Sequence, residues 1–296
     1  MKNTIFTGAG VAIVTPMHED GSINYEELGR LIDFNIDNGT DAIIICGTTG
    51  ESSTMTDEEH LEAIKFAIDH TAKRVPVIAG TGSNDTHYAI HLSQEAEKLG
   101  ADALLVVTPY YNKTSQDGLV AHYTMIAESV SLPIIMYSVG SRTGVNITPE
   151  TCVKLSKVPN IVAIKEASGN ISQIAQIAAL CGKDLDIYSG NDDQILPIMA
   201  LGAKGVISVL SNVMPFETHE IAQLCLENKY DEAREKMFKV QQLAKDLFCD
   251  VNPIPVKHAM NAMGYSCGKP RMPLIELSDA NKAKLEATMR DLGLIK

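Results

Sequence analysis

The stretch that decides the fold is "IVAIKEASGN", residues Ile161–Asn170. It begins with four apolar residues, a pattern typical of a strand that is buried on both faces of a parallel sheet. The run ends at Lys165, and an ammonium group is costly to bury unless it is paired or neutralised. A lysine at this position therefore needs an explanation, and the rest of the chain supplies one.

Seven further apolar runs repeat the pattern along the chain. The starts of consecutive runs are 19 to 33 residues apart, which is close to the roughly 30 residues of one βαβ unit. The eight predicted strands are Gly10–Val14, Ala42–Cys46, Val75–Ala79, Ala103–Val107, Ile134–Tyr137, Ile161–Ile164, Asp186–Ser189 and Gly205–Val209.

Helical patterns fill the intervals between these runs. Tyr25–Asn38 carries apolar residues at helical spacing, and Thr56–His70 begins with a capping box of Thr56 and Glu59. Eight β/α repeats predict the α/β class and a (β/α)8 TIM barrel. The alternative is a doubly wound sheet, but "GTGSND" at Gly80–Asp85 follows the third strand and lacks the third glycine of a dinucleotide signature.

The last part of the chain has helical patterns and no strand pattern. We expect a catalytic barrel over residues 1–225 and a C-terminal helical appendage over residues 226–296. The appendage is predicted to contain three helices, at Asn228–Cys249, Pro255–Met263 and Ser278–Leu292.

Composition excludes several classes of function. The formal net charge of the 296 residues is −12 and no Lys/Arg-rich block occurs, so we expect neither nucleic acid nor anionic membranes as partners. No apolar run approaches the roughly 18 residues of a membrane span, and the N-terminus lacks a signal-peptide pattern, so we expect a cytoplasmic protein. The six cysteines form no C-x-x-C pair and are interpreted as free, buried thiols.

Polar residues follow several of the predicted strands, at the barrel end where TIM-barrel active sites lie. Lys165 there is the solvated end of a strand, or it pairs with Glu166, or, if desolvated, it is a neutral amine that forms Schiff bases with carbonyl substrates. Tyr137 ends a buried strand, where its hydroxyl needs a partner and is placed to transfer protons. Arg142 is either solvated or offers a fork to a substrate carboxylate.

Two further groups are less specific. "GTTGES" at Gly47–Ser52 is either a plain turn or a carboxylate or phosphate site, with the Thr48 and Thr49 hydroxyls beside amide groups at a helix start. Asp192 and Asp193 are expected to cap the following helix rather than bind a metal, because no third ligand accompanies them. We therefore expect no metal site.

Taken together, the motifs resemble the dihydrodipicolinate synthase family, a family of Schiff-base pyruvate-dependent aldolases, over nearly the whole chain. Each motif alone is weak evidence for the family, but seven motifs in this order are highly specific. They are "GTTGES", "VTPYYNK", "YSVGSRTG", "IVAIKEASG", "SGNDD", "GVISVLSN" and "NPIPVK".

The resemblance implies condensation of pyruvate with L-aspartate 4-semialdehyde, without a separate cofactor, because Lys165 itself forms the Schiff base. By the same resemblance, Tyr137 relays protons with Thr48 and with Tyr111 of a neighbouring subunit. The remaining substrate contacts implied by the family are Thr49, Arg142, Gly190 and Ile207.

The resemblance also implies self-association, as a homotetramer built of tight dimers, and a regulatory lysine site at the dimer interface. Residues matching that regulatory site are Ser52, His60, Asn84 and Tyr110. Two positions depart from lysine-inhibited members, because Asp57 stands where these often have His and Tyr88 where they have Glu. We therefore expect weak or absent feedback inhibition.

One departure lies near the expected active site. The family pattern after the fifth strand is Tyr-Asn-Val-Pro-x-Arg-Thr-Gly, whereas this chain has Ser138 and Gly140 at the second and fourth places. Glycine gives up the fixed φ of proline, so the geometry of this loop stays open at the sequence level.

Two alternative functions remain. A sister aldolase, such as N-acetylneuraminate lyase or a 2-keto-3-deoxy sugar acid aldolase, would share Lys165 and Tyr137 but not an arginine suited to a short semialdehyde. A non-catalytic sensor on the same scaffold would have no reason to retain Lys165, Tyr137, Thr48 and Tyr111 together.

Overall fold

The structure is a computed structural model that describes residues 2–296. Eight parallel strands close into a barrel in sequence order, from β1 to β8, and β8 pairs with β1. The predicted (β/α)8 barrel is therefore confirmed. The strands are β1 (Gly8–Ala12), β2 (Ala42–Ile45), β3 (Val77–Gly80), β4 (Ala103–Val107), β5 (Ile134–Ser138), β6 (Ile161–Glu166), β7 (Asp186–Ser189) and β8 (Gly205–Ser208).

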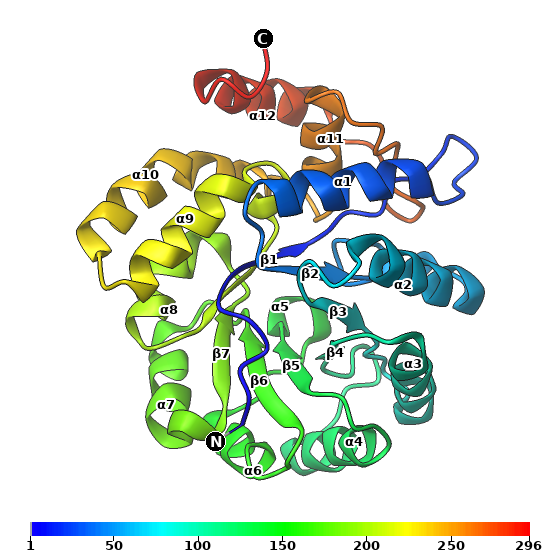
Figure 1. Ribbon diagram of the computed structural model, residues 1–296, viewed down its shortest axis with the longest axis vertical. Helices are drawn as coiled ribbons and strands as arrows, with labels where there is room; N and C mark the ends of the chain where they lie inside the picture. Colours follow the sequence, from blue (N-terminus) through cyan, green and yellow to red (C-terminus); the bar gives the residue numbers. More distant parts are fainter. Residues whose placement is uncertain (1) are drawn as a thin grey trace.

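Helices surround the barrel and cover its outer face (Figure 1). The predicted capping box at Thr56 and Glu59 is present at the start of the second helix. The barrel helices are α1 (Tyr25–Asp37), α2 (Asp57–Thr71), α3 (Thr86–Leu99), α4 (Gln116–Glu128), α5 (Gly140–Thr143), α6 (Pro149–Leu155), α7 (Ile171–Cys181), α8 (Ile195–Ala200) and α9 (Pro215–Leu226), with short 3-10 turns η1 (Ser52–Thr54), η2 (Gly182–Asp184), η3 (Asp192–Gln194) and η4 (Leu210–Asn212).

Three helices follow the barrel, near the predicted places: α10 (Tyr230–Asp246), α11 (Ile254–Ala262) and α12 (Asp279–Asp291). α10 packs on α9 and α12, and α11 packs on α12. The segment after α11 contacts α1, where the Ser266 amide donates to Glu27 Oε1 at 2.8 Å and the Tyr265 ring packs on Phe34. No helix within residues 2–296 has the length and apolarity that crossing a bilayer requires.

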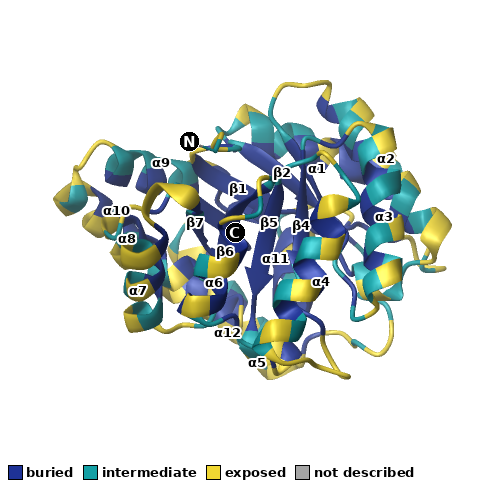
Figure 2. Cartoon of the chain, turned by 90° about the horizontal axis from the view of Figure 1, so that it is seen from below, coloured by how far each residue is buried: buried dark blue, intermediate teal, exposed yellow. Residues whose placement is uncertain are grey.

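The core has two layers, and the strands are buried on both faces while the helices expose their outer sides (Figure 2). Side chains such as Ile43 and Ile64 pack between strands and helices, and side chains such as Ile78 and Ile135 fill the barrel interior. Within the barrel, Phe6 stacks on Tyr188 with ring centroids 4.4 Å apart, so the N-terminal segment helps to fill it. This packing leaves the carboxyl ends of the strands as the place for a site.

Candidate active site

A cavity of about 310 Å³ lies at the carboxyl ends of the strands. Its lining comes from five of the strands, from the loops that follow them, and from a segment before α11. The lining residues are Ala12, Ile44, Gly47, Thr48, Thr49, Leu105, Tyr137, Val139, Ser141, Arg142, Lys165, Ala167, Gly190, Asn191, Val209, Phe248, Asp250, Val251 and Asn252.

Lys165 lies inside β6 rather than after it, because β6 continues to Glu166 and Lys165 pairs with Tyr137 on β5. Its exposed fraction is 5%, and its Nζ is 4.3 Å from the centre of the Tyr137 ring. The Glu166 carboxylate instead accepts hydrogen bonds from Ser168 and Gln173. Within residues 2–296 no ion pair joins Lys165 to Glu166, so the interpretations of Lys165 as a solvated strand end and as a partner of Glu166 are both wrong.

Thr48 and Thr49 lie on the loop after β2 and line the cavity. The α-helix expected directly behind them starts only at Asp57. The amides of Gly50 and Glu51 instead donate within the turn, to the carbonyls of Gly47 and Thr48 at 3.1 Å each. The site therefore offers threonine hydroxyls rather than a helix N-terminus.

Arg142 projects from the short helix α5 at the exposed mouth of the cavity. Its Nη2 donates to the carbonyl oxygen of Asn252 at 3.3 Å. Gly140 is the first residue of α5, and a Cβ added there would meet only ordinary contacts, the nearest at 3.6 Å from the Val145 carbonyl oxygen. The first helical position is also one that proline favours, so the loop that carries Arg142 does not depend on glycine.

Gly190 gives Lys165 its space. A Cβ on Gly190 would lie 3.2 Å from the Lys165 Cε and 2.7 Å from the Ala167 Cβ, so a larger residue would press on the lysine stem. Ile207, also predicted to surround the lysine, is fully buried in the interior core and is not one of the residues that line the cavity.

Asp192 corrects a prediction. It does not cap α8, whose N-cap is Gln194. Its Oδ2 instead accepts hydrogen bonds from the amides of Val209 and Leu210, at 3.0 and 2.9 Å. Burial raises the pKa of this carboxyl group. Asp192 therefore ties the loop after β7 to the end of β8, while Asp193 is exposed.

Sequence reasoning missed the segment Phe248–Asn252 as part of the site. Its first two residues fall at the end of the predicted C-terminal helix, and the others follow no predicted barrel strand. The structure ends α10 at Asp246 and places Asp250 and Asn252 against the cavity. The Nδ2 of Asn252 donates to the Thr49 Oγ1 at 3.0 Å. The "NPIPVK" motif contained the one available signal, since it starts at Asn252.

Tyr111 is not brought to Lys165 within its own chain. Its exposed fraction is 91%, and its φ is +66°, a backbone conformation that is uncommon for a residue with a side chain. The tyrosine that the resemblance places beside Tyr137 therefore points into solvent in a single subunit.

A second cavity of about 350 Å³ contains three of the four predicted regulatory residues, Ser52, His60 and Tyr110. Asn84, the fourth, does not line it. The ring of His60 bonds the Gly80 carbonyl oxygen at 2.8 Å, and burial lowers its pKa. Tyr88 also lines this cavity, and its hydroxyl donates to Asp57 Oδ1 at 2.5 Å.

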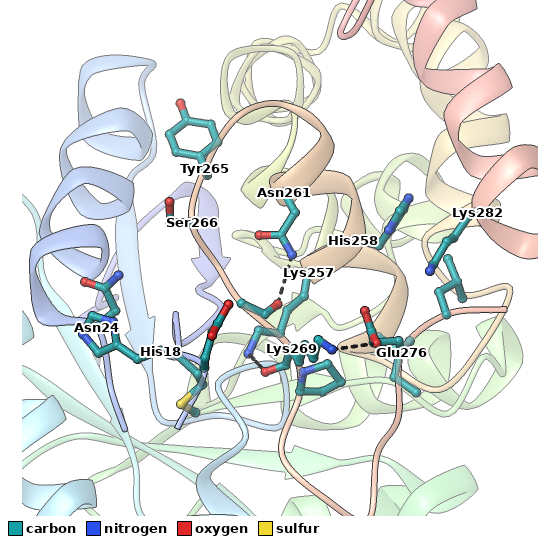
Figure 3. Close-up of a pocket in the computed structure, with 16 residues that line it drawn as sticks. His18, Asn24, Lys257, His258, Asn261, Tyr265, Ser266, Lys269, Glu276 and Lys282 are labelled. Carbon is teal, nitrogen blue, oxygen red and sulfur yellow. Dashed lines mark hydrogen bonds and ion pairs between the residues drawn. The ribbon is translucent and has the colours of Figure 1, made fainter. Parts of the chain in front are cut away.

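A buried ion pair fixes the loop that carries Thr48 and Thr49 to the C-terminal helices. Lys257 on α11 is 1% exposed, and its Nζ donates to Glu51 Oε1 at 2.7 Å and to the Lys269 carbonyl oxygen at 3.1 Å. Arg271 donates its backbone amide to Glu51 Oε2 at 2.8 Å. Figure 3 shows Lys257 directed from α11 toward the backbone near Lys269.

The same region encloses a cavity of about 810 Å³ between the N-terminal part of the chain and α11 (Figure 3). Two of its charged side chains are paired: Lys269 with Glu276, which also lines the cavity, at 3.1 Å, and His258 with Glu286 of α12, outside the lining, at 3.0 Å. These pairs join the C-terminal segments to one another.

No group of three or more His, Cys, Asp or Glu side chains within residues 2–296 is arranged to hold a metal ion. All six cysteines are free thiols, as predicted, and five of them are buried. The side chains that line the cavity offer an amine at Lys165 and hydroxyl, guanidinium and carboxylate groups around it.

Comparisons with known proteins show the family of the chain. Residues 5–292 match the model of the "Dihydrodipicolinate synthetase family". The 4-hydroxy-tetrahydrodipicolinate synthase of Caldicellulosiruptor saccharolyticus is 56% identical over 98% of both chains. A solved synthase from Acinetobacter baumannii, described as complexed with pyruvate, has a TM-score of 0.97 at 43% identity, covering 99% of this chain and 100% of that one.

Another solved relative, described as a monomeric dihydrodipicolinate synthase variant, has a TM-score of 0.96 at 39% identity over 98% of both chains. The match thus extends over the barrel and the C-terminal helices alike. This chain belongs to the dihydrodipicolinate synthetase family.

Proposed function

We propose that this enzyme, a lyase, condenses pyruvate with L-aspartate 4-semialdehyde to give 4-hydroxy-tetrahydrodipicolinate, in lysine and diaminopimelate biosynthesis. The observation that carries the proposal is Lys165, a buried lysine at the carboxyl end of β6 in a cavity of about 310 Å³. Membership of a family whose curated relatives carry the synthase name supports the same reaction.

Lys165 acts as the nucleophile. Its amine adds to the ketone carbon of pyruvate, and water leaves to give an imine. Loss of a proton from the adjacent methyl carbon gives an enamine, whose carbon adds to the aldehyde carbon of the second substrate. The amine of that substrate then attacks the imine carbon and releases Lys165, so that the ring closes with a net loss of one water.

Neighbouring side chains hold the substrates and move the protons. Tyr137, whose ring lies against the Lys165 ammonium, relays protons together with Thr48, which lines the same cavity. Thr49 binds the pyruvate carboxylate, and Arg142 at the mouth binds the carboxylate of the semialdehyde.

Gly190 and Ile207 complete the surroundings of the lysine. Gly190 leaves the space into which the imine forms, because a Cβ added there would lie 3.2 Å from the Lys165 Cε. Ile207 supports the site from the barrel interior, where its side chain is fully buried. No separate cofactor takes part, because the covalent adduct on Lys165 supplies the activation.

The active enzyme is an oligomer in which Tyr111 of one subunit reaches the Tyr137 hydroxyl of the next. Its support is the exposure of Tyr111 in a single chain. The assembly is a homotetramer of tight dimers, and the enzyme is located in the cytoplasm. The chain forms two parts, a catalytic barrel over residues 1–225 and a helical part over residues 226–296.

Trapping tests the proposed nucleophile. The enzyme is incubated with pyruvate, reduced with borohydride, and digested for mass spectrometry. The expected result is an N-(1-carboxyethyl) adduct on Lys165 that is absent from a Lys165→Arg variant. An unmodified Lys165 in active enzyme would overturn the Schiff-base mechanism. Replacing the semialdehyde by sialic acid in the activity assay separates this enzyme from the sugar-acid lyases.

Feedback inhibition by lysine is weak or absent. The cavity with Ser52, His60 and Tyr110 has a phenol at Tyr88 in place of the glutamate that would pair with the amine of a bound lysine. Asn84 lies outside the lining of this cavity. The enzyme should keep its activity at millimolar L-lysine, and a clear drop would contradict this expectation.

A further inference from the structure

We propose that Asp250 recognises the α-ammonium group of the aldehyde substrate and thereby sets the specificity of the site for an amino-acid semialdehyde. The inference rests on the proposed function and names a further substrate contact within the same cavity. It assigns a role to a segment, Phe248–Asn252, that lies outside the barrel strands and their loops.

The charges around the cavity are the first observation. Of the described residues that line it, Arg142 is cationic, Lys165 carries the amine proposed to react with pyruvate, and Asp250 is the one acidic residue. Pyruvate carries one carboxylate and no positive charge, so it has no use for an acidic contact. The semialdehyde is a zwitterion, and its ammonium group needs an anionic partner beside the arginine that takes its carboxylate.

The position of Asp250 relative to Arg142 is the second observation. Arg142 donates to the carbonyl oxygen of Asn252 at 3.3 Å, and Asp250 precedes Asn252 by two residues, which limits their Cα separation to about 7 Å. Yet no ion pair within 4.0 Å joins Asp250 to Arg142 in residues 2–296. Asp250 and Arg142 thus line one cavity without forming an ion pair with each other. A zwitterionic substrate could therefore place its ammonium group at Asp250 and its carboxylate at Arg142.

The orientation of the carboxylate is the third observation. The Asp250 Oδ1 accepts a hydrogen bond from the Val251 amide at 2.7 Å, which fixes the side chain on its own backbone. An ionised carboxylate has about four acceptor positions, so this bond leaves capacity for a substrate donor. Asp250 is half-buried, and the apolar side chains of Phe248 and Val251 beside it line the same cavity.

The test compares two aldehydes and two variants. Asp250→Asn removes the charge and keeps the shape, whereas Asp193→Asn removes an equal charge from an exposed aspartate on the loop after β7 that does not line the cavity. Each enzyme is assayed for its KM for L-aspartate 4-semialdehyde and for pyruvate. Each is also assayed for the inhibition constant of succinic semialdehyde, the same aldehyde without the ammonium group.

Loss of a partly screened charge-assisted bond should raise the KM for aspartate semialdehyde about tenfold in Asp250→Asn. The pyruvate KM and the succinic semialdehyde constant should stay within about twofold, and Asp193→Asn should behave as the parent enzyme. An equal effect on both aldehydes, or no effect on either, would overturn the assignment.

Measuring the parent enzyme in the same assays distinguishes a failure of the Asp250 assignment from a failure of the proposed function. Borohydride trapping of pyruvate on Lys165 and turnover of aspartate semialdehyde by the parent enzyme establish the reaction without reference to Asp250. A normal Asp250→Asn variant in that background therefore contradicts only the role of Asp250.

Discussion

Asn252 contacts two residues that are proposed to bind substrate carboxylates. Its Nδ2 donates to the Thr49 hydroxyl, and its backbone carbonyl accepts from Arg142. Because the Thr49 oxygen already accepts a hydrogen bond, its own proton is free to be donated elsewhere, which is what a pyruvate carboxylate needs. The side-chain amide of Asn252 thus leaves the Thr49 hydroxyl to act as a hydrogen-bond donor in the site.

Replacing Asn252 tests whether it directs the Thr49 hydroxyl to donate to pyruvate. Asn252→Ala should raise the KM for pyruvate about three- to tenfold, the value of one hydrogen bond. Asn252→Asp should raise this KM further, because the carboxylate would accept the hydrogen bond of the Thr49 hydroxyl and would repel the pyruvate carboxylate. Steady-state kinetics at saturating semialdehyde check the order, and equal effects of the two variants would point to lost packing instead.

His122 should make the stability of the fold depend on pH. It is buried on α4, its Nδ1 bonds the Thr86 hydroxyl at 2.9 Å, and its Nε2 is buried without a partner. Burial lowers the pKa of His122 to about 4, below that of an unfolded histidine. Between about pH 6.5 and pH 4 the unfolded chain therefore binds more protons at this residue, and stability falls as the pH falls.

The size of this effect is about 1–2 kcal/mol between pH 7.5 and pH 5, after allowance for partial solvation. Urea unfolding of the parent enzyme and a His122→Gln variant at the two pH values measures it. The free energy of unfolding should fall less in the variant, since glutamine does not titrate. Parallel losses in both proteins would show that other groups control the acid sensitivity.

Residues of the site were predictable where they lie in or just after the carboxyl end of a strand. Lys165, Tyr137 and Arg142 were found because a barrel gathers the carboxyl ends of its strands at one rim. Asp192 was misassigned because its partners, the Val209 and Leu210 amides, are 17 and 18 residues away. Local capping rules cannot detect a hydrogen bond that only the closed barrel creates.

At the scale of elements, strand starts were easier to predict than strand ends. Parallel strands are apolar on both faces, so the apolar runs marked the strand starts. The predicted start matches in β2, β4, β5, β6, β7 and β8 and differs by two residues in β1 and β3, whereas both ends match only in β4 and β7. β6 was ended too early at Ile164, because Lys165 and Glu166 are charged although they still pair with Tyr188 and Ser189. Lys165 reaches the cavity, and the Glu166 carboxylate accepts hydrogen bonds from Ser168 and Gln173.

The link between the loop after β2 and α11 should carry a large share of local stability. Glu51 and Lys257 form an ion pair whose side chains are 2% and 1% exposed. Burial lowers the pKa of Lys257, and Glu51 opposes that shift. Removing one partner leaves a buried charge uncompensated.

Lys257→Met should therefore destabilise the protein by about 3–5 kcal/mol, and the double variant Glu51→Gln, Lys257→Met should recover part of that loss. Urea unfolding of the parent, the single variant and the double variant measures both values. A matched surface control is Lys65→Met, which breaks an exposed pair with Asp69 and should change stability by less than about 1 kcal/mol. A double variant no more stable than Lys257→Met would contradict the ion-pair argument.

At the scale of the whole molecule, the place of the C-terminal helices could not be predicted from the sequence pattern. Periodicity located α10, α11 and α12 along the chain, but it did not indicate that the segment between α10 and α11 reaches the cavity. The contacts from Asn252 to Thr49 and from Lys257 to Glu51 span more than 200 residues. Such long-range contacts depend on tertiary packing, which no local pattern encodes.

In one subunit Tyr111 is 91% exposed, with φ at +66°. The proposed role of Tyr111 therefore requires a second subunit, whose active site this tyrosine would enter. A symmetric dimer would exchange the residue in both directions, so that each site takes its lysine from one chain and its tyrosine from the other. Lys165→Arg and Tyr111→Phe chains should each be nearly inactive alone. A heterodimer of the two would hold one site with both residues intact.

Co-expression of the two variants with different affinity tags, followed by purification through both tags, isolates that heterodimer. Its activity per dimer should be about half that of the parent, because one of its two symmetric sites is complete. Each variant purified alone is the matched control, and sedimentation confirms that the association state is unchanged. If Tyr111 served its own subunit instead, neither site of the heterodimer would be complete and the purified heterodimer would stay as inactive as its parents.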